Sequence, residues 1–502
     1  MDQRAKEFGK DGRGHPPKES VPAKGTEVKV SGIKFGTDGW RAIISDDFTF
    51  DNVKIVAQAV SDFLNEEYQN EKAIKTVVGY DPRFMSEKYA EIVTRVFIAN
   101  GINVVLTDRP SPTPAVAYAI RNKKLNGGIM ITASHNPPYY NGIKYKAFYA
   151  GSGDPQIIGK IEAKLQKNPV KIVSPDEMKA SELFKYEDVC PAHLKFLSAY
   201  LDWKVLKKGK FKVLVDVMHG AADHFVEELL AKTKNKVVTI RSERDAYFGG
   251  VNPEPVRQNL AVSMSKVKKE KFDVGIVTDG DVDRIAIIGP DGKLLTGHKV
   301  IALLLLHLLE DRKMKGEVVQ TICGTGLIDN ICKKHGLKMH ETPVGFKYIC
   351  DLMRTRDILI GGEEAGGIGY KNYIPERDGI LSGLLILEMM IYRNKSLLTI
   401  LKIIEKEYGS FHYRRIDVKY PDELKPKLMS MLKTNPPKEI MGKRVVDSKT
   451  YDGVKLILED KSWLLLRLSG TEPILRIYAE SSTDRKALEM LEIGKKIAFG
   501  IK

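Results

Sequence analysis

The sequence predicts an α/β protein of several domains, and three observations support this class. The chain has 502 residues, 43% of them hydrophobic, enough for roughly three or four separate cores. In three regions an apolar run is followed by a turn rich in glycine or proline, a helical pattern and a second apolar run. Strand, helix and strand in succession imply a parallel sheet. After Tyr408 the pattern changes to short strands, typical of a small α+β domain.

The first unit contains five predicted elements. Apolar residues recur at helical spacing over residues 53–64, and a second helical pattern covers residues 86–99. Strands are predicted at residues 76–80, 103–106 and 128–131. The second unit is predicted to hold strands at 211–217 and 237–240 around a helix at 223–231.

The third unit and the C-terminal part complete the prediction. A strand at 317–322 precedes a helix that ends near residue 335. The apolar run at 300–309 predicts a buried helix, because a membrane span needs about 20 apolar residues. Strands are expected at 445–446, 451–458, 463–468 and 474–480, and a helix at 484–499.

Composition narrows the possible functions. The four cysteines show no CxxC spacing, so neither disulfides nor zinc are expected and a cytoplasmic location is predicted. The net charge of +15 requires nucleic acid to be considered as a partner. The lysines are spread along the chain, however, and small anionic substrates explain the charge equally well. We expect neither a nucleic-acid nor a membrane partner.

A serine loop, Thr132-Ala133-Ser134-His135-Asn136-Pro137, follows the strand predicted at 128–131. Ligands collect past the carboxyl ends of strands in open α/β sheets, which makes Ser134 a candidate nucleophile or phosphate carrier. Taken alone, the loop fits an ordinary polar turn as well.

An Asp loop, Asp279-Gly280-Asp281-Val282-Asp283-Arg284, lies between two apolar runs. Three carboxylates on one tight turn favour a cation, and oxygen ligands suit Mg²⁺ or Mn²⁺. Two alternatives stay open. One is an acidic hairpin without metal, and the other is a phosphatase in which Asp279 is the nucleophile.

A sugar loop and a phosphate loop complete the candidate motifs. In the sugar loop, Gly361 to Gly367, glycines surround Glu363, which could bind neighbouring sugar hydroxyls. A flexible acidic turn is the alternative. The phosphate loop, Arg467 to Pro473, combines a guanidinium with hydroxyls and free N–H groups, which can hold a phosphate, although a plain hairpin turn also fits.

The order of these four loops resembles that of the α-D-phosphohexomutase family, and the resemblance covers the chain from about Ser31 to the C-terminus. It implies four domains around a central cleft: three related α/β units with mixed sheets and a smaller C-terminal α+β domain. On this basis we expect a flexible basic tail (1–30), domain I with the phosphoserine loop (31–197), domain II with the metal loop (198–295), domain III with the sugar loop (296–408) and domain IV with the phosphate loop (409–502).

The resemblance also implies a role for each site residue. The implied catalytic residues are Ser134, as phosphoryl carrier, with His135, Lys144, Lys347 and Arg41. The implied ligands of Mg²⁺ are Asp279, Asp281, Asp283 and a phosphoserine oxygen of Ser134. The implied substrate-binding residues are Arg284, Gly345, Glu363, Ala365, Arg467, Ser469, Gly470, Thr471 and Arg476.

The implied reaction is reversible phosphoryl transfer within a hexose phosphate, through a hexose 1,6-bisphosphate that also serves as activator. The stretch Thr342 to Lys347 resembles phosphoglucomutases, which favours glucose. Two departures bear on the sugar: Ala365 replaces a common serine, and Gly367 stands where branches acting on both glucose and mannose often have histidine. A phosphomannomutase or dual-specificity mutase is therefore the alternative, and a phosphoglucosamine mutase is less expected. Outside the mutases, a Mg²⁺-dependent sugar phosphatase and a non-catalytic sugar-phosphate sensor remain alternatives. A monomer or homodimer is expected.

Overall fold

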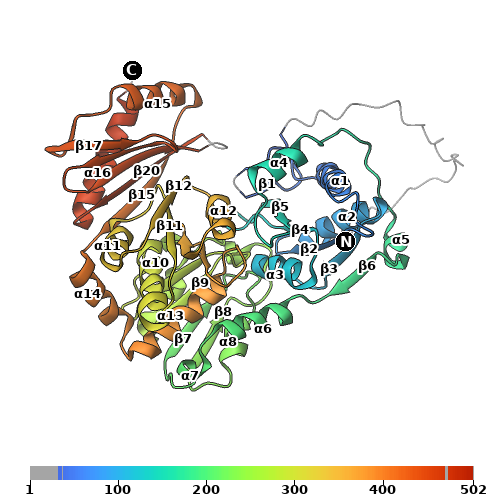
Figure 1. Cartoon of the computed structure of the whole chain (residues 1–502), viewed down its shortest axis with the longest axis horizontal. Helices are drawn as coiled ribbons and strands as arrows, with labels where there is room; N and C mark the ends of the chain where they lie inside the picture. Colours follow the sequence, from blue (N-terminus) through green and yellow to red (C-terminus); the bar gives the residue numbers. More distant parts are fainter. Residues whose placement is uncertain (1–31, 37, 470–472, 501–502) are drawn as a thin grey trace, which may run out of the picture.

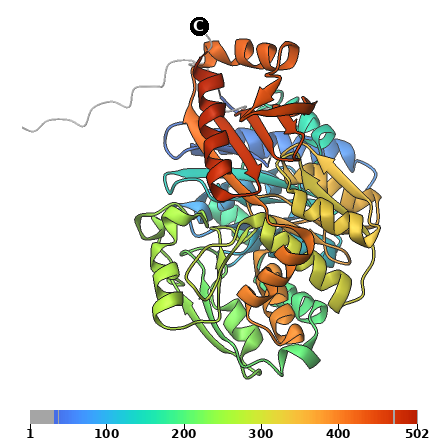
Figure 2. The ribbon, with the colours of Figure 1, turned by 90° about the vertical axis from the view of Figure 1, so that its left-hand side faces the viewer.

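The computed structural model describes residues 32–36, 38–469 and 473–500, which form four β-sheets built from successive stretches of the chain (Figure 1). The predicted tail, residues 1–30, lies outside the described residues. In Figure 2 the red C-terminal domain lies at one end of the molecule and the green second domain at the other. The predicted class, three α/β units with mixed sheets and a C-terminal α+β domain, is confirmed.

The first sheet is mixed, in the order β1-β5-β4-β2-β3-β6. Its strands are β1 Trp40–Ile43, β2 Lys75–Tyr80, β3 Asn103–Thr107, β4 Gly127–Ile131, β5 Tyr140–Ala147 and β6 Phe184–Glu187. Strand β2 pairs in parallel with β3 and β4, as predicted, while β5 pairs antiparallel with β4 and β1. The neighbours Val77 and Val78 belong to different core clusters, because successive side chains of a strand point to opposite faces.

Helices cover both faces of this sheet. Val78 packs in the cluster formed with α1 (Phe50–Glu67) and α2 (Ser86–Ala99), and Val77 in the cluster formed with α3 (Thr113–Lys123). Two short helices, α4 (Pro155–Glu162) and α5 (Pro175–Ala180), complete the unit. Helix α2 has the predicted bounds.

The second and third sheets repeat this plan with four strands each, in the orders β10-β9-β7-β8 and β12-β11-β13-β14. The second comprises β7 Lys212–Asp216, β8 Lys236–Ile240, β9 Val274–Thr278 and β10 Ile285–Ile288, and the third β11 Glu317–Thr321, β12 Met339–Thr342, β13 Ile358–Gly362 and β14 Ile368–Tyr370. The accompanying helices are α6 Cys190–Tyr200, α7 Trp203–Leu206, α8 Phe225–Leu230, α9 Ala261–Lys269, α10 Gly297–Leu306, α11 Gly326–His335, α12 Phe346–Thr355, α13 Gly379–Arg393 and α14 Leu397–Tyr408. A π-helical turn, His307–Asp311, continues α10, so the predicted buried helix at 300–309 is confirmed.

The fourth sheet is antiparallel throughout, in the order β15-β20-β19-β18-β17-β16. It comprises β15 His412–Lys419, β16 Glu439–Ile440, β17 Lys443–Lys449, β18 Val454–Leu458, β19 Trp463–Leu468 and β20 Ile474–Ser481, with helices α15 Lys425–Thr434 and α16 Asp484–Phe499. Strand β18 begins at Val454 rather than at Tyr451, because Gly453 has a φ of 86° that breaks the extended conformation.

Helix α13 joins the second and third units. Its residues are buried from Gly379 to Met390, and Gly383 lies so close to β9 that a Cβ there would meet Ile276 Cγ2 at 2.5 Å. Only a glycine allows this approach of helix and sheet. No helix among the described residues is long and apolar enough to cross a membrane. The apolar runs of α10 and α13 instead form the core shared by the first three units.

Each motif loop occupies the same kind of place in its own sheet. The serine loop joins β4 to β5, the Asp loop joins β9 to β10, the sugar loop joins β13 to β14, and the phosphate loop joins β19 to β20. In all four cases the two joined strands are antiparallel neighbours. The equivalent placement supports the prediction that the first three units share one layout.

Candidate active site

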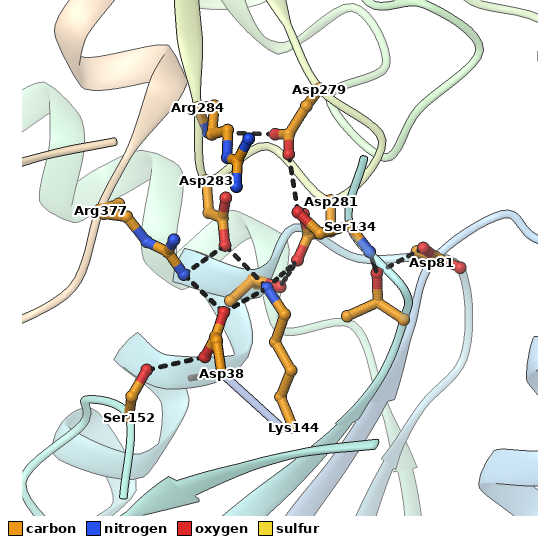
Figure 3. A network of polar contacts seen from close by, with 12 residues as sticks. Asp38, Asp81, Ser134, Lys144, Ser152, Asp279, Asp281, Asp283, Arg284 and Arg377 are labelled. Atoms are coloured by element: carbon orange, nitrogen blue, oxygen red, sulfur yellow. Dashed lines mark hydrogen bonds and ion pairs between the residues drawn. The ribbon is translucent and has the colours of Figure 1, made fainter. Parts of the chain in front are cut away.

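Ser134 lies at the start of the turn after β4, as predicted, with its side chain directed at the Asp loop (Figure 3). Its Oγ is 2.9 Å from Asp279 Oδ2, and the residue is almost fully buried. Ser134 has a φ of 52°, in the left-handed region that residues other than glycine rarely adopt. Its N–H donates to Thr132 Oγ1 at 2.8 Å, which helps to hold this conformation.

The three aspartates of the Asp loop converge, and each has an oxygen atom within 4.8 Å of the others. All three are fully buried. Among the described residues, Asp281 Oδ1 and Asp283 Oδ1 are buried without a hydrogen-bond partner. Buried carboxylate oxygens need a donor or a cation, and hard oxygen ligands suit Mg²⁺. The residues therefore fit the predicted metal site.

The carboxylates differ in their ionisation. Burial, reinforced by the negative charges of Asp283 and Asp281, raises the pKa of Asp279 well above its usual range. Burial acts in the same direction on Asp281, but the ammonium group of Lys144, the Thr113 hydroxyl and Arg377 together outweigh it, and the pKa of Asp281 is lowered. A cation among the three carboxylates would favour their charged forms.

Lys144, on β5, contacts two carboxylates of this cluster. Its Nζ lies 2.8 Å from Asp281 Oδ2, 2.8 Å from Asp283 Oδ2 and 2.9 Å from Asp38 Oδ2. Burial disfavours its charge, but these carboxylates prevail and the pKa of Lys144 is raised. The side chain is therefore an ammonium ion at neutral pH.

His135 belongs to the serine loop, and Arg41 and Arg284 lie near it. Arg41 Nη1 donates to Asn136 Oδ1 at 2.7 Å, and the backbone N–H of Arg284 donates to Asp279 Oδ1 at 3.0 Å. Burial, together with the positive charges of Arg284 and Arg41, lowers the pKa of His135 well below its usual range. Its imidazole is therefore neutral at pH 7 and is a weaker base than an ordinary histidine.

The sugar loop meets the Thr342–Lys347 turn through Glu363. Glu363 Oε1 accepts the N–H of Gly345 at 3.0 Å. Burial raises the pKa of Glu363 to about 7, against the opposing effect of Arg377. Ala365 is half-buried in the same loop. Lys347 does not contact Ser134; it lines a cavity of about 170 Å³ together with Asp38.

The phosphate loop belongs to domain IV, where Asp452 links Arg467 to the third unit. Asp452 accepts from Arg467 Nε at 2.8 Å and from the N–H of Val344 at 2.8 Å. Ser469 is buried, and Arg476 Nε lies 3.5 Å from Asp417 Oδ2. The predicted residues Gly470 and Thr471 lie outside the described residues.

Two charges at the centre of the site, the half-buried Asp38 and the buried Arg377, were not predicted. Arg377 Nη2 lies 2.7 Å from Asp38 Oδ2 and 2.6 Å from Asp283 Oδ2 (Figure 3). Its Nη1 lies 3.8 Å from Glu363. The guanidinium thus connects the first unit, the Asp loop and the sugar loop. The charged run Glu376-Arg377-Asp378 before a glycine is typical of a surface turn. Only its similarity to the Asp loop could have indicated that Arg377 belongs to the site.

Gly367 and Arg377 depend on each other. A Cβ at residue 367 would lie 2.5 Å from Arg377 Cδ and 3.5 Å from Glu363 Oε2. The arginine side chain therefore fills the space that a side chain at residue 367 would need. This explains why glycine stands at residue 367 in this chain.

Comparison with known proteins agrees with this arrangement. Family models for the phosphoglucomutase/phosphomannomutase α/β/α domains I, II and III match residues 32–171, 191–292 and 296–408, and the model for the C-terminal domain matches residues 419–492.

Similar proteins carry more than one name. The phosphoglucomutase/phosphomannomutase of Thermococcus kodakarensis is 31% identical over 93% of this chain and 98% of its own length. The phosphoglucosamine/phosphogalactosamine mutase of Sulfurisphaera tokodaii is 29% identical over 93% of this chain and 100% of its own length. A crystal structure from Thermus thermophilus, assigned as a phosphomannomutase, superposes with a TM-score of 0.82 at 32% identity, covering 94% of this chain and all of that one. The chain belongs to the phosphoglucomutase/phosphomannomutase family, that is, to the α-D-phosphohexomutases.

Proposed function

We propose that this phosphohexomutase interconverts glucose 1-phosphate and glucose 6-phosphate, with Ser134 as the phosphoryl carrier. The observation that carries the proposal is the position of the Ser134 hydroxyl, 2.9 Å from Asp279 and beside two further buried carboxylates. A phosphoryl group on this oxygen would lie against the proposed metal ligands Asp279, Asp281 and Asp283. Bound Mg²⁺ would supply charge neutralisation on the transferring group and on the departing serine oxygen.

The proposed reaction consists of two phosphoryl transfers. A sugar hydroxyl oxygen attacks phosphorus, the bond between phosphorus and Ser134 Oγ breaks, and the hydroxyl proton passes to a base. The resulting hexose 1,6-bisphosphate reorients, Ser134 Oγ attacks its other phosphorus, the bond between that phosphorus and the sugar oxygen breaks, and the proton held by the base returns to the sugar oxygen as the isomeric monophosphate leaves. His135 and Lys347 are the two candidates for this base: the His135 imidazole is neutral at pH 7 and has a lone pair available, but its lowered pKa makes it a weak acceptor. Lys144 is an ammonium ion and acts in the proposal as a fixed positive charge.

Substrate contacts come from both ends of the site in this proposal. Glu363 and Gly345 bind the sugar hydroxyls, and Ala365 supplies no hydroxyl of its own. Arg41 and Arg284 stand near the transferred phosphate. Arg467, Ser469 and Arg476, with the predicted partners Gly470 and Thr471, hold the other phosphate. We also propose the domain boundaries 197/198, which falls in the last turn of α6, 295/296 and 408/409, a cytoplasmic location, and a monomer or homodimer.

Replacement of Ser134 by alanine tests the carrier role. The variant should lose mutase turnover with glucose 1-phosphate, Mg²⁺ and glucose 1,6-bisphosphate supplied, because no oxygen remains to carry the phosphoryl group. Retained turnover would reject the proposal. Release of inorganic phosphate by Ser134→Ala, abolished by Asp279→Asn, would favour the phosphatase alternative.

The preference for glucose rests on the Thr342–Lys347 turn, which contacts Glu363 through Gly345. The related proteins carry names that include mannose and glucosamine phosphates, so a side-by-side assay is needed. We expect kcat/KM for glucose 1-phosphate to exceed those for mannose 1-phosphate and glucosamine 1-phosphate. A higher value for either competitor would overturn the sugar assignment and leave the carrier role of Ser134 untouched.

A further inference from the structure

Arg83, in the turn after β2, is a fully buried arginine that takes no part in the proposed chemistry. Its guanidinium has five N–H donors, and all five find an acceptor. Nε donates to Asp81 Oδ2 at 3.1 Å. Nη1 donates to the carbonyl oxygens of Pro137 at 2.8 Å and Tyr140 at 3.0 Å.

The remaining two donors bind the serine loop itself. Arg83 Nη2 donates to the carbonyl oxygens of Ser134 at 2.6 Å and Asn136 at 2.7 Å. Four carbonyl groups between residues 134 and 140 thus point at one planar cation. Because those carbonyls turn inward, the backbone of Ser134 takes the left-handed φ of 52° that presents its hydroxyl to Asp279.

Two further contacts fix the guanidinium. Asp81, its ion-pair partner, also accepts from Thr132 Oγ1 at 2.6 Å, and Thr132 in turn accepts the N–H of Ser134. The ring of Phe248, in the second unit, lies over the guanidinium with its centroid at 5.0 Å. Arg83 therefore binds the serine loop and also packs against the second unit, which carries the Asp loop.

We propose that Arg83 is a positioning residue: it holds residues 134–140 in the conformation that directs the Ser134 hydroxyl at the Asp loop. The inference rests on the proposed role of Ser134 as phosphoryl carrier. Lysine cannot replace this arginine, because an ammonium group has three donors and lacks the planar fork. A positive charge at residue 83 is therefore not sufficient to hold residues 134–140.

The test compares Arg83→Lys with a matched control, Arg312→Lys. Arg312 also forms a bidentate pair, with Glu388, donates to a carbonyl oxygen, that of Tyr200, and has an aromatic ring beside it, but neither of these partners belongs to the serine loop. Arg83→Lys should lower kcat per folded molecule by about 10- to 100-fold with KM nearly unchanged, because a small misplacement of a reacting group is costly. Arg312→Lys should leave kcat per folded molecule unchanged.

Hydrogen exchange gives a readout that does not depend on turnover. Amides of residues 132–140 should exchange faster in Arg83→Lys than in the wild type and should not change in Arg312→Lys. If Arg83→Lys fails to fold, Phe248→Leu, which keeps every hydrogen bond of Arg83, should show the same changes to a smaller extent.

Unchanged kcat and unchanged exchange in the folded Arg83 variant, or in Phe248→Leu where Arg83→Lys does not fold, would overturn the inference. Retained turnover in Ser134→Ala would instead reject the proposed function. The exchange comparison would still decide whether Arg83 holds the loop.

Discussion

At the scale of single residues, the site depends on buried charges that compensate one another. Lys144 and Arg377 each contact two or more carboxylates, and Asp38 contacts both cations. A buried charge without a partner is strongly unfavourable, so removal of any one member leaves the others uncompensated. The arrangement fixes the Asp loop and the sugar loop relative to each other.

Glu363 should give the stability of the protein a pH dependence. Its pKa is raised by burial from 4.5 to about 7, so between these values the native carboxyl binds a proton that the unfolded chain has released. Its contribution to the free energy of unfolding therefore falls by about 3 kcal/mol as pH rises from 4.5 to 7. Glu363→Gln removes this effect.

Melting temperatures measured from about pH 5 to about pH 8 check this prediction. Relative to the wild type, the glutamine variant should gain stability as pH rises through this range. Parallel curves for the two proteins would show that Glu363 titrates near its ordinary value.

Gly367→Ala should disturb the site through Arg377. The new Cβ would meet Arg377 Cδ at 2.5 Å, so the guanidinium must leave Asp38 or Asp283. Overpacking of this kind costs about 1–3 kcal/mol. Melting temperatures of Gly367→Ala, Arg377→Ala and the double variant form a double-mutant cycle. Gly367→Ala should lower the stability less in the Arg377→Ala background than in the wild type. Additive losses would contradict the steric explanation.

At the scale of elements, the start of α3 supports the Asp loop. The Oγ1 of Thr113, its first residue, donates to Asp281 Oδ2 at 2.6 Å, and its N–H donates to the Asp281 carbonyl at 2.9 Å. Groups that orient metal ligands often change metal affinity by about 10- to 100-fold when removed. Thr113→Val should therefore raise the Mg²⁺ concentration for half-maximal activity by about tenfold or more.

A Mg²⁺ titration of turnover measures this shift. Thr113→Ser, which retains the hydroxyl, is the control and should behave like the wild type. An unchanged titration for Thr113→Val would mean that Asp281 is oriented by Lys144 alone.

The elements also show where sequence patterns suffice. The patterns at 86–99 and 484–499 predict helices with the observed bounds, because their apolar residues face one core. Strand β5 was not predicted, although the alternation of Lys144 and Lys146 with apolar residues is typical of a strand with one solvent-facing side. Both lysines are buried instead, against carboxylates more than 130 residues away in sequence. The four loops were identifiable locally, whereas Asp38, Arg83 and Arg377 acquire their meaning only from distant partners.

At the scale of the whole molecule, the metal should be needed for turnover and not for folding. Asp281 and Asp283 already have ammonium and guanidinium partners supplied by the chain, and apolar cores hold the α/β units and domain IV together. Treatment with EDTA should abolish turnover and leave the far-ultraviolet circular dichroism spectrum unchanged. Added Mg²⁺ should restore activity. Loss of helical signal on chelation would show that the ion has a structural role.

The two lysines of β5 also bear on synthesis of the chain at the ribosome. Lys146 pairs with Glu376, 230 residues later, and Lys144 pairs with Asp281, 137 residues later. At about 5–20 residues per second, the last of these partners is made roughly 10–50 s after the lysines. Until then a nascent first domain has Asp38, 2.9 Å from Lys144 and 3.6 Å from Lys146, as the nearby carboxylate for two lysines on a surface that later becomes interior. Final closure of this domain must wait for the third, which orders assembly from the N-terminus toward the C-terminus.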